Sequence, residues 1–348
     1  MKTNKHTARY HYGFFGLIFT STFLLFLVSG CSQNKNLLPP HEWEYLTVTL
    51  KKGDLQVSIK NNEHLYNPFR KRDLLGLNGI IDLSHPAERV SPISHTCINL
   101  EHIFAGDRLL DLFEPRTHYM SLLKGKDDEW QLYQSPTPIS QVETLTSFKL
   151  TAPHYIDIKV KCMIHSDDFI THDYLGLFFA SYIEAPEDKR IFFQGYEKGE
   201  TTPKWIEAYS EKHGDKSTHI AKDDDKDAFY FAPDFNVKLA NHFSEYKYDK
   251  PFYYGRFKNM VLAFLFDSSE IIRFSQSPTG GGAKNPAWDF QYIIPNPQLK
   301  KEYSFRARIV YKPFISEEDV LKEYQDWKET LNIGLTKFKR MIPKDKYI

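Results

Sequence analysis

The dominant pattern along the chain is the alternation of apolar and polar residues with a period of two, which is typical of strands that bury one face. The alternation is clearest at 156–164 and at 303–311, where every second residue is apolar. The segments 177–179 and 261–266 are apolar at consecutive positions, which predicts central strands covered on both faces. Shorter apolar runs predict further strands at 45–50, 55–59, 175–183, 190–193, 260–266, 271–274 and 290–294.

One strong helix is predicted near the C-terminus. Ser316 can cap it, and Asp319 lies three residues later, as in a capping box. Apolar residues then recur on one helical face, at Val320, Leu321, Tyr324, Trp327 and Leu331. Because strands otherwise dominate, we expect an all-β fold: a large two-layer β-sandwich with one C-terminal α-helix, forming a single domain over residues 45–348.

The N-terminal segment differs in character from the rest of the chain. Basic residues precede an uncharged and mostly apolar run at 14–28, which ends in Val28-Ser29-Gly30-Cys31. A basic start, a short apolar run and small residues at a cut site are typical of a secretory signal peptide. The run is also shorter than the roughly 20 residues that span a bilayer comfortably. An uncleaved membrane anchor with a chance Gly-Cys is the alternative.

This ending resembles the lipobox of bacterial lipoproteins. The resemblance implies removal of residues 1–30 as a signal peptide and attachment of lipid to Cys31, with 31–44 as a lipidated tether. Two or three acyl chains would anchor the protein stably to a membrane. Ser32 replaces the aspartate that retains lipoproteins in the inner membrane of enterobacteria. We therefore expect a lipid-anchored location in the cell envelope, at the outer membrane.

Composition narrows the class of protein further. The formal net charge is zero, which argues against an electrostatic nucleic-acid binder. The 27 Phe and 21 Tyr residues can supply a large core. With Cys31 lipidated, Cys97 and Cys162 remain, and a disulfide between them and two buried thiols are both open. We find no phosphate loop, no Cys-x-x-Cys and no Gly-x-Ser-x-Gly, and we expect neither a cofactor nor a metal.

Two polar segments are candidates for a site. The first is 94–102, and the second is 275–289, which contains three consecutive glycines at 280–282. In the second segment, Trp288 offers an aromatic face for stacking on a sugar, and Asp289 offers a carboxylate for its hydroxyls. The alternative is a glycine-rich turn between core strands, with Trp288 buried.

The first segment carries a resemblance. Ser94-His95-Thr96-Cys97-Ile98-Asn99-Leu100 resembles the Asn-His-Ser/Thr-Tyr-Phe-Asn-Leu motif of aldose 1-epimerases, whose fold is a β-supersandwich. The segment 301–311 also resembles the closing strand of that family. The resemblance implies that His95 is the general acid and that a late carboxylate, here Asp289, is the base. The chain departs from the motif at positions 94, 97 and 98, and it has Asp where the family has Glu. It also looks like uncharacterised secreted bacterial proteins.

The catalytic candidates are thus His95 and Asp289. Residues that could line a sugar pocket around them are Asn99, Glu101, His102, Arg116, His219 and Trp288. His213 and His219 could bind a metal, although histidines on a surface loop are the more ordinary interpretation. We expect a carbohydrate-active enzyme, possible reactions being sugar epimerisation, elimination by a lyase and glycoside hydrolysis. The alternatives are a glycan-binding surface lipoprotein without catalysis and a structural envelope lipoprotein.

Overall fold

The computed structural model describes residues 37, 44–63, 76–267 and 270–341. Contacts divide the chain into two units, 1–35 and 36–348, and all described residues belong to the second unit. The expected signal peptide, Cys31 and most of the expected tether lie outside the described residues.

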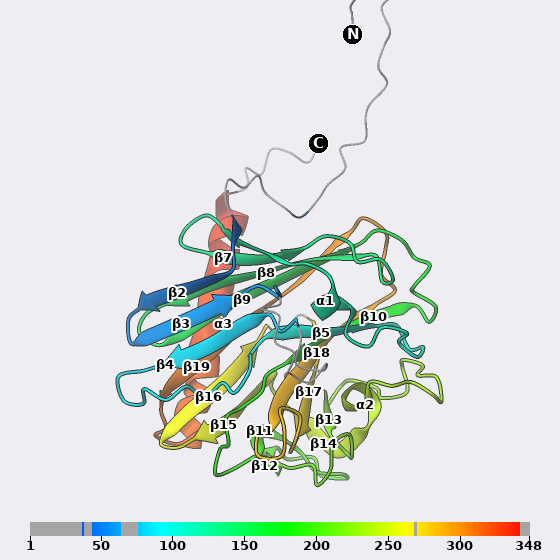
Figure 1. Cartoon of the computed structure of the whole chain (residues 1–348). Coiled ribbons are helices and arrows are strands. Elements are labelled where there is room, and N and C mark those ends of the chain that lie inside the picture. The colour runs from blue at the N-terminus through cyan, green and yellow to red at the C-terminus, as the bar shows by residue number, and fades with distance from the viewer. Residues whose placement is uncertain (1–36, 38–43, 64–75, 268–269, 342–348) are drawn as a thin grey trace, which may run out of the picture. The chain divides into compact units, whose positions relative to one another are not determined.

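The all-β prediction is confirmed, since the described residues form a 16-stranded sheet and a 3-stranded sheet (Figure 1). One half of the large sheet runs β1 (Glu44–Tyr45), β6 (Ser121–Lys124), β7 (Trp130–Gln134), β8 (Val142–Thr151), β9 (Tyr155–Ile164), β19 (Glu302–Pro313), β16 (Met260–Phe266), β15 (Phe252–Phe257). It continues β11 (Ile191–Tyr196), β14 (Phe243–Tyr248), β13 (Thr218–Ala221), β17 (Ile271–Ser277), β18 (Ala287–Pro295), β10 (Tyr174–Ala180), β5 (Asn99–Phe104), with β12 (Lys204–Ala208) pairing β11. The small sheet is β2 (Thr47–Lys52), β3 (Leu55–Lys60), β4 (Gly79–Ser84).

The large sheet turns back on itself to make a sandwich. In its spatial order, six strands lie between β18 and β19. Nevertheless the ring of Tyr292 on β18 lies 4.9 Å from the ring of Phe305 on β19. Phe179 of β10 also approaches Phe305, at 5.9 Å. Strands so distant in the sheet can touch only if two layers face each other, so the core lies between them.

The small sheet adds to the same core, because Val57, Ile59 and Leu83 from its strands are buried in the main cluster of apolar residues. The prediction that 261–266 is covered on both faces is confirmed. On β16, Leu262 and Phe264 face this main core, whereas Val261 and its alternate neighbours face the helix described next.

Helix α3 (Glu317–Met341) covers the outer face of β15, β16 and β19 (Figure 1). The predicted cap is present, since the backbone N–H of Asp319 donates to Oγ of Ser316 at 3.2 Å. The predicted apolar stripe is also present, with Val320, Tyr324 and Trp327 buried against the sheet. Two helices of four residues were not predicted: α1 (Glu114–Thr117) and α2 (Lys238–Asn241).

Cys97 and Cys162 are both free thiols in the core, so the open choice between a disulfide and two thiols is resolved in favour of thiols. Burial raises the pKa of Cys97 to about 12, which makes its thiol inert. None of the helices within the described ranges is long and apolar enough to cross a membrane. The same residues contain no group of three or more His, Cys, Asp and Glu side chains positioned to hold a metal ion.

Candidate active site

A cavity of about 210 Å³ lies beside β5, β10 and β18, near one end of the order of strands in the large sheet. Its walls combine polar and apolar side chains. The polar residues include Glu101, His102, Tyr182, His213, Lys238 and Asp289. The apolar residues include Leu112, Phe113, Phe178, Val237, Leu239 and Ala287. Such a mixture of apolar walls and a few polar groups is typical of a small-molecule site.

A β-bulge brings two neighbouring residues of β5 into this cavity. The pairing of β5 with β10 shifts register, so that His102 lies opposite Phe178 while Leu100 lies opposite the next residue, Phe179. Glu101 is therefore the extra residue of a bulge. In a regular strand, consecutive side chains point to opposite faces, but a bulge re-aims one of them. Glu101 and His102 consequently both line the cavity.

Helix α1 carries Arg116, whose guanidinium group pairs with Glu101. Hydrogen bonds with several side chains hold this short helix in place. The side-chain amide of Asn62 donates to the backbone carbonyls of Arg116, at 3.3 Å, and His118, at 2.5 Å. The amide of Gln134 donates to the carbonyl of His118 at 2.7 Å. The carboxylate of Glu114 accepts a hydrogen bond from the backbone N–H of Ser140. The bonds from Asn62 and Gln134 satisfy carbonyls at the helix end, and all of these contacts help to hold Arg116 in place.

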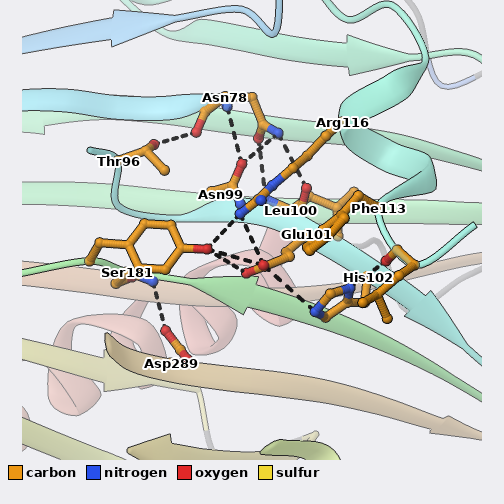
Figure 2. Close-up of polar contacts among 12 residues, drawn as sticks. Asn78, Thr96, Asn99, Leu100, Glu101, His102, Phe113, Arg116, Ser181 and Asp289 are labelled. Atoms are coloured by element: carbon orange, nitrogen blue, oxygen red, sulfur yellow. Dashed lines mark hydrogen bonds and ion pairs between the residues drawn. The ribbon is translucent and has the colours of Figure 1, made fainter. Parts of the chain in front are cut away.

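The buried polar centre of the site consists of Glu101, Arg116 and Tyr182. Figure 2 shows Arg116 reaching towards Glu101. Nη2 of Arg116 lies 3.0 Å from Oε1 of Glu101 and donates to the hydroxyl of Tyr182 at 2.6 Å. That hydroxyl in turn donates to the Glu101 carboxylate at 3.0–3.1 Å. Burial raises the pKa of Tyr182 well above its ordinary value, so the phenol keeps its proton and acts as a donor. The carboxylate is thus neutralised by Arg116.

His102 has the hydrogen-bonding pattern of a proton acceptor. Its Nδ1 is bonded to the backbone carbonyl of Leu112, and because a carbonyl only accepts, Nδ1 carries the hydrogen. In the neutral ring, Nε2 then has a lone pair, and it lies 3.7 Å from Oε1 of Glu101. The ring packs between Phe113 and Phe178, with centroids 5.2 and 5.4 Å away. Burial lowers the pKa of His102 and therefore favours this neutral form.

The pKa of Asp289, on β18, is shifted in the opposite direction to that of His102. The Asp289 side chain is buried, and one of its oxygens accepts a hydrogen bond from the backbone N–H of Ser181 at 2.8 Å. Burial, followed by the negative charge of Glu101, raises the pKa of Asp289 well above its ordinary value. Burial therefore favours a neutral His102, which can accept a proton, and a protonated Asp289, which can donate one.

Of the two residues expected to be catalytic, the cavity is lined by Asp289 and not by His95. Nε2 of His95 bonds instead to the carbonyl of Gly281 at 3.0 Å, and its ring lies 5.9 Å from that of Tyr182. His95 thus contacts both Gly281 of the glycine-rich loop and Tyr182, and it lies outside the cavity lining. Gly280, in the same loop, does line the cavity.

Of the six residues expected to bind substrate, two line the cavity. Glu101 and His102 line the cavity, whereas Arg116 is buried beside Glu101 and is not part of the lining. Asn99 does not line the cavity. Its Oδ1 accepts hydrogen bonds from the side chain and the backbone of Asn78.

Trp288 and His219 are in the core and do not line the cavity. Trp288 is fully buried, and its indole N–H donates to the carbonyl of Lys189 at 3.1 Å. A Cβ added at Gly255 would lie 2.2 Å from the Trp288 ring, so this residue fills the space left by a glycine. The ring of His219 lies 5.2 Å from that of Phe193, and burial lowers its pKa to about 3.

Sequence reasoning missed Tyr182 and Lys238 altogether, and it paired His213 with His219 as a loose metal candidate. The structure separates those two histidines, since His213 lines the cavity. Tyr182 carried a weak signal, because it lies two residues after the end of the apolar strand β10. Nothing in the local sequence marks Lys238, which reaches the cavity from α2.

Comparison with known proteins gives a similarity of fold. No known family model matches the sequence, and no curated protein matches it. Similar solved structures include a provisionally named aldose 1-epimerase from Escherichia coli K12, with 8% identity, TM-score 0.44, and coverage of 77% of this chain and 99% of that one. A provisionally named mutarotase from Salmonella typhimurium has 9% identity, TM-score 0.40, and coverage of 77% and 90%. A heparinase III has 9% identity, TM-score 0.34, and coverage of 81% and 37%. Similarities this loose transfer neither a residue role nor a reaction.

Proposed function

We propose that the cavity is the active site of a carbohydrate-active enzyme that moves protons through His102 and Asp289. The observation that carries the proposal is that a histidine and a carboxyl group, His102 and Asp289, line one cavity. Burial lowers the pKa of His102 and raises that of Asp289, which suits a base and an acid respectively. A neutral base and a neutral acid together allow a proton to enter and another to leave the substrate near neutral pH.

The walls of the cavity support a sugar as the substrate. Phe113 and Phe178 provide apolar surface, and Glu101, His102 and Asp289 provide hydrogen-bonding groups on the same cavity. A sugar ring has apolar C–H faces and hydroxyls around its edge, so it matches such a lining. The motif resemblance of residues 94–100 points in the same direction, although its histidine lies behind the cavity.

The proposed step moves one proton from the enzyme to the sugar and one proton from the sugar to the enzyme. Asp289 donates its proton to a sugar oxygen, and Nε2 of His102 accepts a proton from a sugar carbon or hydroxyl. The imidazolium that forms is stabilised by the Glu101 carboxylate 3.7 Å away. In this scheme Asp289 is the acid and His102 is the base, and His95 positions Gly281 of the glycine-rich loop. Epimerisation, elimination and hydrolysis differ in which substrate bond breaks next.

The experiment is a panel of mono- and oligosaccharides assayed for both binding and turnover. Wild type is compared with His102→Gln and Asp289→Asn, and His85→Gln is the matched control at a histidine outside the cavity. We expect wild type and the control to turn over at least one sugar, and each cavity variant to lose roughly 10²–10⁴-fold of that activity. Binding by wild type without turnover of any sugar would instead favour the glycan-binding alternative.

We further propose that this domain is held at the outer membrane by lipid on Cys31. The support is the lipobox-like Val28-Ser29-Gly30-Cys31 after an apolar run that lacks charge. In a Gram-negative host, wild type should partition into detergent and co-sediment with outer membranes. Cys31→Ser should leave an unlipidated precursor. Equal lipid labelling of both forms would contradict the assignment.

A further inference from the structure

We propose that the mouth of the cavity binds the carboxylate of an acidic sugar, a hexuronic acid unit, through Lys238 and His213. This inference rests on the proposed function and specifies its substrate class. Both residues line the cavity and both are exposed, so they lie where a substrate enters.

Lys238 and His213 come from segments that pack together. A Cβ added at Gly214, next to His213, would lie 2.6 Å from Cβ of Lys238. The carbonyl of Gly214 also accepts a hydrogen bond from His242, which follows α2. These contacts place the stem of the lysine against the backbone that carries His213, on one side of the mouth.

Among the charged groups around the cavity, Lys238 is the one whose positive charge a ligand would compensate. Glu101 is neutralised by Arg116, and burial favours the neutral forms of His102 and Asp289. Within the described parts of the chain, Lys238 makes no ion pair with a carboxylate. A neutral sugar would leave that ammonium solvated, whereas a sugar carboxylate would receive a charge-assisted hydrogen bond from it.

His213 can supply a second polar contact. Its Nδ1 is bonded to Oγ of Ser277 at 2.9 Å, which fixes the ring at the mouth. Its Nε2 has no hydrogen-bond partner among the described residues. Leu239 and Val237 lie next to Lys238 in sequence and line the apolar wall, so an acidic group at the mouth would leave the sugar ring against them.

The test uses matched ligands: uronic-acid oligosaccharides, and the same oligosaccharides after chemical reduction of each carboxylate to a primary alcohol. Binding is measured by calorimetry for wild type, Lys238→Met and Lys238→Arg, with Lys52→Met as the control at an exposed lysine of β2. We expect wild type and Lys52→Met to prefer the acidic ligand by roughly tenfold to a hundredfold, the value of one charge-assisted hydrogen bond. Lys238→Met should abolish the preference, and Lys238→Arg should retain most of it.

Equal binding of acidic and reduced ligands by wild type, binding of neither, or an unchanged preference in Lys238→Met would overturn the inference. These failures are separable from failure of the proposed function. If neutral sugars are turned over in a manner that depends on Asp289, the enzyme assignment stands without the acidic substrate. If the preference depends on Lys238 but no glycan is turned over, acidic-sugar binding stands without the enzyme.

Discussion

Nη2 of Arg116 lies 3.0 Å from Oε1 of Glu101, and both side chains are at least nine-tenths buried. The two residues come from different elements, Glu101 from the bulge in β5 and Arg116 from the clamped helix α1. Because the arginine neutralises the carboxylate, a second carboxyl group, Asp289, can lie close enough to be coupled to it electrostatically. The pair is thus the structural base on which the proposed acid–base chemistry depends.

Arg116→Met should be strongly destabilising, because it leaves the buried Glu101 charge uncompensated. The expected loss in the free energy of unfolding is about 3–5 kcal/mol, measured by urea denaturation. The double variant Arg116→Met/Glu101→Gln should recover part of that loss, since the buried charge is then gone. If Arg116→Met costs no more than Arg89→Met, at an exposed arginine, the ion pair does not have this role.

Asp289→Asn should change how stability depends on pH. The folded pKa of Asp289 lies well above its ordinary value of 3.8. Between those two pKa values the folded state binds more protons than the unfolded state, so stability falls as pH rises. In Asp289→Asn this dependence is absent, so its unfolding free energy should fall less than that of wild type as the pH rises above 3.8. Asp223→Asn, in the exposed acidic loop, should behave like wild type.

His219 should contribute to acid unfolding. Burial lowers its folded pKa to about 3 from the ordinary value of 6.5. The unfolded state binds the extra proton in this interval, so stability is present above pH 6.5 and is lost as the pH falls towards about 3. His219→Gln should be less stable near neutral pH but should lose less stability on acidification. An acid-unfolding profile with the wild-type slope would contradict this role, and His172→Gln, at a more exposed histidine, is the control.

The period-two pattern was enough to predict the sandwich, because burial on a strand repeats every second residue. The consecutive apolar residues of 261–266 correctly marked β16 as a strand between the core and α3. The helix was equally accessible, since Ser316 and the stripe ending at Trp327 are local signals. Such features depend on residues close together in the sequence.

The candidate site depends on contacts that the local sequence does not contain. By strict alternation, Glu101 and His102 would point to opposite faces, and the bulge that unites them exists only in the pairing with Phe178 and Phe179 of β10. Trp288 looked suited to sugar stacking, but its burial depends on a glycine of β15, Gly255. The sequence therefore named some residues of the candidate cavity, but not the geometry that brings them together.

The measurement that tests the central claim most directly is the turnover rate of Asp289→Asn on a sugar that wild type converts, with binding measured alongside. We predict that the variant binds the sugar with little change but that its kcat falls by roughly 10²–10⁴-fold, because the amide fills the same space but cannot donate the acid proton. A variant that retains the wild-type kcat would contradict the account, since Asp289 could not then be the acid of this cavity.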